Sequence, residues 1–139
     1  MRRGGAAEGV APSEIQRLFD AYVIMQAQQA LQLTDEQYPK FLGRVKALQS
    51  ARQRGLAARV RILREIRRLS DAASVDDTQA RAQIQALADL DVRTESEVRD
   101  ALAGVDEVLD VRQQLRFRLF EEQMERRKVE LLMRARQNR

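Results

Sequence analysis

The stretch that decides the fold is LTDEQ, Leu33–Gln37, which lies between two segments with helical periodicity. Thr34 suits the N-cap of a helix. Its hydroxyl can accept the main-chain N–H of Gln37, and the Gln37 side chain can reach back to the N–H of Thr34, as in a capping box. Leu33 stands where a hydrophobic staple forms, and the two acidic residues of the cluster fall in the first turn, where the helix dipole favours negative charge. The cluster predicts the start of a long helix, with a structural role.

Three further positions repeat this spacing, a capping residue followed three residues later by glutamine. Apolar residues at intervals of three and four continue from each of them, which is typical of amphipathic helices. The predicted helices begin at Ser13, Thr34, Asp76 and Asp110 and end near Ala30, Leu69, Asp106 and Arg136. The fold class is therefore all-α with four helices. We expect a single helical domain over residues 13–136, a disordered tail at 1–12 and a short tail at 137–139.

The second and third helices predict a long antiparallel hairpin that turns near Ala73. Apolar residues of the two segments can be paired so that the residue numbers of each pair sum to 146 or 147. A constant sum is what an antiparallel pairing requires. The pairs are Tyr38–Leu109, Leu42–Val105, Val45–Leu102, Leu48–Val98, Leu56–Leu90, Val60–Leu87 and Leu63–Ile84.

Charge supports the same pairing. Between Arg52 and Arg68 there are seven arginines and one glutamate, whereas between Ser74 and Asp110 there are ten acidic residues and three arginines. Opposite charges therefore face each other along the hairpin, and we expect the arginine run to be a solvated face paired with the third helix. Exposed pairs are worth about 0–1 kcal/mol each, so they select the register more than they stabilise it.

The composition argues against an enzyme. The chain of 139 residues contains no Cys and no His, which excludes thiolate nucleophiles, imidazole bases and His or Cys metal ligands. It has no phosphate-binding glycine loop of either common type. We expect no catalytic residues, no metal and no cofactor. The sequence also contains no apolar run long enough to span a membrane, and its first residues lack the apolar core of a signal peptide.

LTDEQ matches the L-T-x-x-Q motif and resembles the Spy/CpxP-like family of small helical periplasmic proteins. That family carries two such motifs, and the second corresponds here to Leu109-Asp110-Val111-Arg112-Gln113, in which aspartate replaces threonine. Aspartate is an equally good N-cap. The resemblance covers about residues 13–136. It implies a cradle-shaped antiparallel dimer built on a long hairpin, a periplasmic location, and ATP-independent binding of unfolded polypeptides. The family's metal-binding members use histidine, which this chain lacks.

The residues predicted to contact a client or a second subunit form another apolar stripe on the second helix, with arginines nearby. They are Arg61, Ile62, Ile66, Arg68 and Leu69. The motif residues Leu33, Thr34, Gln37, Leu109, Asp110 and Gln113 are predicted to cap helices.

The predicted function is that of a non-enzymatic, chaperone-like or stress-response protein. Two alternatives stay open: a regulatory partner of an envelope sensor or sigma-factor regulator, and a basic helical nucleic-acid-binding protein. The expected partners are polypeptide clients or one regulatory protein, with a homodimer as the assembly and nucleic acid disfavoured. The net charge of +4 is modest, and no aromatic residues are interleaved with the basic run.

Overall fold

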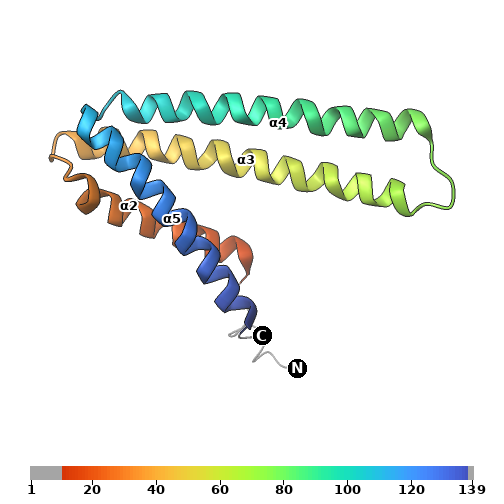
Figure 1. Ribbon diagram of the computed structural model, residues 1–139, viewed down its shortest axis with the longest axis horizontal. Coiled ribbons are helices and arrows are strands. Elements are labelled where there is room, and N and C mark those ends of the chain that lie inside the picture. Colours follow the sequence, from red (N-terminus) through yellow and green to blue (C-terminus); the bar gives the residue numbers. More distant parts are fainter. Residues whose placement is uncertain (1–10, 138–139) are drawn as a thin grey trace. The chain divides into compact units, whose positions relative to one another are not determined.

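Residues 11–137 are described by a computed structural model, in which they form four α-helices and no strand (Figure 1). The helices are α2 (Pro12–Leu31), α3 (Gln37–Asp71), α4 (Asp77–Asp106) and α5 (Val111–Gln137). The predicted all-α class and the four helices are confirmed. Of the two predicted tails, residues 1–10 and 138–139 lie outside the described residues. Pro12 and Gln137, which were assigned to the tails, belong to helices.

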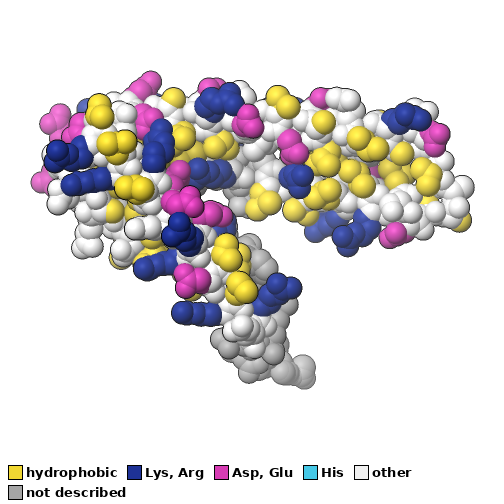
Figure 2. Space-filling model, in the orientation of Figure 1, with side chains coloured by type: hydrophobic (Ala, Val, Ile, Leu, Met, Phe, Trp, Pro, Cys, Tyr) yellow, Lys and Arg dark blue, Asp and Glu magenta, His cyan; other side chains and the backbone are white. Residues whose placement is uncertain are grey.

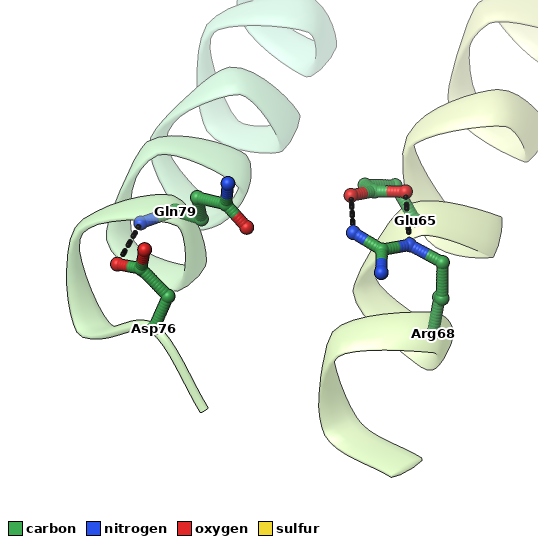
Figure 3. A network of polar contacts seen from close by, with 4 residues as sticks. All are labelled: Glu65, Arg68, Asp76 and Gln79. Atoms are coloured by element: carbon green, nitrogen blue, oxygen red, sulfur yellow. Dashed lines mark hydrogen bonds and ion pairs between the residues drawn. The ribbon is translucent and has the colours of Figure 1, made fainter. Parts of the chain in front are cut away.

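Three of the four predicted helix starts are confirmed. Thr34 and Asp110 cap α3 and α5, as described below. Asp76 caps α4 by accepting the main-chain N–H of Gln79 at 3.2 Å (Figure 3) and that of Thr78 at 2.9 Å. Because a side-chain oxygen satisfies N–H groups that have no partner within the helix, each cap fixes where its helix begins.

The predicted cap at Ser13 is wrong. Ala11 is the N-cap of α2, Pro12 follows it, and no side chain makes a capping hydrogen bond there. Proline is favoured at the first helical position because its φ angle is already helical and its missing N–H would have no partner there. The Gln16 side chain, which was expected to complete the box, donates to Asp20 instead at 2.8 Å.

The chain divides into two compact units. The first contains the described residues up to Leu42 and from Val108 onward, and the second is Gly43–Glu107. In the first unit α2 packs against α5. All six aromatic residues belong to this unit, and Phe41 and Phe117 meet edge to face with their ring centroids 5.9 Å apart. The buried apolar residues of this unit are Phe19, Ala27, Leu31, Leu33, Phe41, Leu109, Phe117, Phe120 and Met124.

The second unit is an antiparallel pair of helices, α3 and α4, joined by a short connection (Figure 1). The two helices approach closely at Gly55, because a Cβ on this residue would lie 3.1 Å from the Cβ of Thr94. Large apolar side chains fill the contact on either side of this point. The buried apolar residues of the unit are Val45, Leu48, Ala51, Leu69, Leu90 and Val105.

The predicted register is partly wrong. Val45, Leu48 and Val105 are buried as expected, but Leu56, Val60, Leu63 and Ile84, which were placed in the contact between the helices, are exposed. Gly55 of α3 faces Thr94 of α4, and the residue numbers of this pair sum to 149 instead of the predicted 146 or 147. The reason is that α3 turns its small residues toward α4. The inward positions are Leu48, Ala51, Gly55, Ile62, Ile66 and Leu69, all buried or half-buried.

The predicted charge pairing between the two helices is confirmed at two positions of the arginine run. Arg59 Nε lies 3.0 Å from Asp91 Oδ1, and Arg54 Nη2 lies 3.9 Å from Glu97 Oε1. At the other end of the unit, Arg44 Nη1 lies 3.1 Å from Glu107 Oε1. All of these side chains are largely exposed, so each pair contributes little free energy.

Candidate functional site: the paired motifs and the exposed flank of the hairpin

The first motif forms a complete capping box. The Gln37 main-chain N–H donates to Thr34 Oγ1 at 3.1 Å, and the Thr34 main-chain N–H donates to Gln37 Oε1 at 3.1 Å. Two N–H groups that the start of α3 leaves without helical partners are thereby satisfied. Leu33, which precedes the cap, is buried. The motif acts as predicted.

The second motif forms the same box with aspartate in place of threonine. The Gln113 main-chain N–H donates to Asp110 Oδ1 at 2.8 Å, and the Asp110 main-chain N–H donates to Gln113 Oε1 at 3.0 Å. Leu109 is buried, as Leu33 is in the first motif. The substitution of aspartate for threonine therefore leaves the motif's hydrogen bonds intact.

The two motif glutamines also bind each other, which the sequence did not predict. Gln37 Nε2 donates to Gln113 Oε1 at 2.7 Å, and Gln113 Nε2 donates to Gln37 Oε1 at 3.0 Å. The second N–H of each amide donates to a main-chain carbonyl, from Gln37 to Val108 at 3.1 Å and from Gln113 to Leu31 at 3.3 Å. We call this arrangement the glutamine pair.

Every hydrogen-bonding position of the glutamine pair is occupied within the protein. Each amide oxygen accepts one N-cap N–H and one N–H from the other glutamine, and each amide nitrogen uses both of its hydrogens. Gln113 is only 6% exposed. A buried amide that is fully satisfied stabilises the fold and offers no free donor or acceptor to a ligand. The pair therefore joins the starts of α3 and α5 to the end of α2.

The end of α2 approaches this pair through a left-handed residue. Gln32 has φ 53° and ψ 53°, and its N–H donates to the carbonyl of Gln29 at 3.3 Å while that of Leu33 donates to Gln28 at 3.3 Å. These two bonds form a Schellman motif, and the buried Leu33 and Ala27 supply the apolar contact that often accompanies it. The turn brings the carbonyl of Leu31 within reach of Gln113.

The residues predicted to contact a client lie in different environments. Leu69 is 6% exposed and belongs to the core, and Ile62 and Ile66 are half-buried between the helices. Arg61 is exposed. The structure thus leaves little of this stripe for a partner.

Arg68 is exposed but already holds a partner on its own helix. Its Nε donates to Glu65 Oε1 at 2.9 Å and its Nη2 to Glu65 Oε2 at 2.6 Å (Figure 3). These hydrogen bonds, with the attraction between the charges, lower the pKa of the Glu65 carboxyl and raise the pKa of the Arg68 guanidinium. The charge of Arg68 is therefore largely compensated before any partner binds.

Part of the exposed apolar surface of the second unit is a strip that we call the hairpin flank. It consists of Leu56, Val60, Leu63 and Ile84, which are 53%, 40%, 39% and 63% exposed. Hydrophobic side chains gather over the parts of α3 and α4 nearest their connection, with Lys or Arg side chains along the α3 edge (Figure 2). This is the surface that the sequence assigned to the helix contact.

The Arg59–Asp91 ion pair shows that the members of the hairpin flank share one side of the unit. Leu56 and Leu63 lie three residues before and four residues after Arg59, so all three residues are on one face of α3. Ile84 lies seven residues, or two turns, before Asp91 and is on the Asp91 face of α4. Because the ion pair joins these two faces, the apolar side chains lie on one side of the unit.

Among residues 11–137 no three His, Cys, Asp or Glu side chains are grouped so that they could hold a metal ion. None of the four helices has the length and apolarity that a membrane-spanning segment requires.

The chain matches no protein-family model, no curated protein and no solved structure. The resemblance to the Spy/CpxP-like family therefore depends on the two motifs and on the order of the helices alone.

Proposed function

We propose that this protein is a non-enzymatic, ATP-independent, chaperone-like protein of the Spy/CpxP type, which holds unfolded polypeptides on the hairpin flank in the periplasm. The single observation that carries the proposal is the exposed apolar strip on α3 and α4. The two motifs support the proposal indirectly, because the resemblance to a family of polypeptide-binding proteins depends on them. Under this proposal the motifs stabilise the helical fold, and the hairpin flank binds the unfolded polypeptide.

The hairpin flank has the chemistry of a weak, adaptable binding surface. Its α3 residues occupy positions i, i+4 and i+7, so they present a narrow apolar strip about 10 Å long. Arg67 lies one turn after this strip, and Arg59, whose charge is compensated by Asp91, lies within it. Basic side chains accelerate the encounter with acidic segments, and burial of the apolar strip retains the client.

A flat strip of this kind favours extended or partly unfolded polypeptides over small molecules. Small-molecule sites are concave and bury most of the ligand's surface. The four aliphatic side chains of the hairpin flank lie on two adjacent antiparallel helices and offer a contact surface that is not concave. An unfolded chain exposes short apolar segments that can cover such a strip in many registers. The result is low specificity, which suits a protein that prevents aggregation.

The test is suppression of aggregation of a chemically denatured client protein, followed by light scattering. Replacing Leu56 and Leu63 with Ser should raise the scattering toward that of the client alone. The two substitutions remove exposed side chains, so helicity should be retained in circular dichroism. The matched control replaces Leu18 and Met25 of α2 with Ser, since these side chains are as exposed but lie in the other unit. This control should protect the client as the wild type does.

Three results would overturn the proposal. If the wild type does not suppress aggregation, the regulatory-partner function replaces the chaperone-like one. If the hairpin variant protects fully but becomes monomeric, the hairpin flank is a dimer contact. If the wild type shifts DNA in a salt-sensitive manner and protects no client, the nucleic-acid-binding alternative is correct.

A further inference from the structure

Helix α5 presents an outward side that lies opposite its contact with the rest of the first unit. The contact includes Phe117 and Met124, which are 0% and 8% exposed. A residue two positions before or after either of them is turned by about 200° around the helix and points away from the contact. The exposed residues at these positions are Leu115, Leu119, Glu122 and Arg126.

Two more residues continue this side toward the end of the helix. Val129 and Met133 follow Glu122 and Arg126, respectively, by seven residues, or two turns. The six residues are spaced by four, three, four, three and four positions, which is the heptad spacing of helices that pair along a seam. We call them the α5 seam. Its four apolar side chains are strongly exposed, Leu115 to 64%, Leu119 to 67%, Val129 to 49% and Met133 to 54%.

The α5 seam is apolar at both ends and charged in the middle. Figure 2 shows hydrophobic side chains near the beginning and toward the end of α5, with charged side chains of both signs between them. The spacing reads the same from either end, so an antiparallel copy places a seam residue opposite every seam residue. The numbers of facing residues sum to 248, and the pairs are Leu115–Met133, Leu119–Val129 and Glu122–Arg126. Apolar residues therefore meet apolar residues, and each acid meets a base.

Charge selects the antiparallel orientation. Glu122 and Arg126 are 66% and 75% exposed and form an ion pair within their own helix at 4.0 Å. In an antiparallel pair of helices, two such ion pairs come together in opposite directions, so that acids and bases alternate around the twofold axis. In a parallel pair, Glu122 would face Glu122 and Arg126 would face Arg126. Like charges that face each other at a contact are repulsive, so the parallel arrangement is disfavoured.

The charged residues at the edges of the seam do not alter this choice. Glu125 of the two copies would lie near each other close to the axis, whereas Arg116 and Glu130 would lie near each other at two places. Arg116 is half-buried and already donates to Gln32 at 3.3 Å. Because exposed charge pairs contribute little, none of these contacts decides the association.

We propose that the α5 seam is a self-association site, along which a second copy of this chain packs antiparallel about a twofold axis. A twofold contact requires a surface that is complementary to itself. The seam meets this requirement in its apolar residues and in its charges over a length of about 27 Å. Six layers make a small contact, so the association should depend on protein concentration. The proposal does not depend on the hairpin flank, which belongs to the other unit.

The first test reverses the charges in the middle of the seam, and sedimentation velocity of the full chain measures the oligomeric state over a range of concentrations. The wild type should associate as concentration rises. Glu122→Arg alone and Arg126→Glu alone should each remain monomeric, because like charges then face each other twice. An equimolar mixture of the two variants should associate again, since every facing charged pair is then of opposite sign. Mixing would not restore association to variants that had failed to fold.

The second test reads the register by crosslinking, for which the chain offers a background without cysteine. A Leu119→Cys chain mixed with a Val129→Cys chain should form a covalent dimer with a short bismaleimide. Either chain alone should not, because equivalent positions of an antiparallel pair would lie about 15 Å apart along the helix axis. A parallel pair would instead crosslink through Leu119→Cys alone.

Replacing Leu119 and Val129 with Ser should weaken the association roughly tenfold or more at unchanged helicity. The control replaces Leu18 and Met25 of α2 with Ser, which are 68% and 69% exposed in the same unit, and should leave the association unchanged. The proposal is overturned if the wild type stays monomeric at every concentration, or if either charge variant alone associates as the wild type does. Crosslinking through Leu119→Cys alone would also overturn it.

Discussion

Gly55 of α3 faces Thr94 of α4 so closely that a Cβ on Gly55 would lie 3.1 Å from the Thr94 Cβ and 2.7 Å from its Oγ1. The first distance involves an atom that no side-chain rotation can move. Gly55→Ala should therefore force the helices apart and lower the free energy of unfolding by about 1–3 kcal/mol, the usual cost of overpacking. Urea denaturation followed by circular dichroism measures the change.

Gly43 provides the matched control for this prediction. It lies in the same helix, but nothing would come within 4 Å of an added Cβ. Gly43→Ala should therefore stabilise the protein by about 0.5–1 kcal/mol, because alanine restricts the unfolded chain and favours helix. Equal effects of the two substitutions would mean that α3 and α4 do not approach each other at Gly55.

The contrast between these glycines explains why the register could not be read from the sequence. Two stripes run along α3, one through Leu56 and Leu63 and the other through Gly55 and Ile62, and they are offset by one residue. Both have helical spacing, so periodicity predicts the helix without selecting its inward side. The larger aliphatic residues favoured the first stripe. The second is inward because small residues allow a closer approach of the two backbones.

Helix starts, by contrast, were predictable because they depend on local chemistry. Thr34, Asp76 and Asp110 each satisfy main-chain N–H groups within three residues of themselves. The glutamine pair was not predictable, since it joins residues 76 positions apart and depends on how the helices meet. The one available signal was that both motifs end in glutamine, a side chain with donors left over after capping.

The left-handed residue at the end of α2 yields a stabilising substitution. Gln32 has φ 53°, a conformation that costs a residue with a Cβ roughly 1 kcal/mol more than glycine. Gln32→Gly should raise the free energy of unfolding, although it removes an exposed hydrogen bond of 3.3 Å from Arg116. Gln32→Ala, which loses the same hydrogen bond but keeps the strain, is the control and should not stabilise. Thermal denaturation of the wild type and the two variants measures these differences in stability.

The second motif allows a direct comparison of threonine and aspartate as caps. Asp110→Ala removes the oxygen that accepts the Gln113 N–H at 2.8 Å and should cost about 1 kcal/mol. Asp110→Thr restores the residue of the first motif and should remain within about 0.5 kcal/mol of the wild type. A loss of more than that in the threonine variant would show that the carboxylate does more than cap.

The same caps distinguish a structural motif from a binding site. Thr34→Ala should cost about 1 kcal/mol for the same reason, since it removes the oxygen that accepts the Gln37 N–H. At a temperature where the variant is fully folded, its protection of a denatured client should equal that of the wild type. Thr34→Ser, which keeps the hydroxyl, is the control for stability. Lost protection in a fully folded Thr34→Ala protein would assign a contact with the client to the motif.

Gln37 and Gln113 join the two motifs into one structure. A double-mutant cycle tests this claim, with Gln37→Ala, Gln113→Ala and the double variant compared by urea denaturation. Each single substitution leaves the other amide partly unpaired in a half-buried or buried place and should cost about 2–3 kcal/mol. The double variant should cost about 1–2 kcal/mol less than the two single costs together. Additive costs, within about 0.5 kcal/mol, would contradict the pairing.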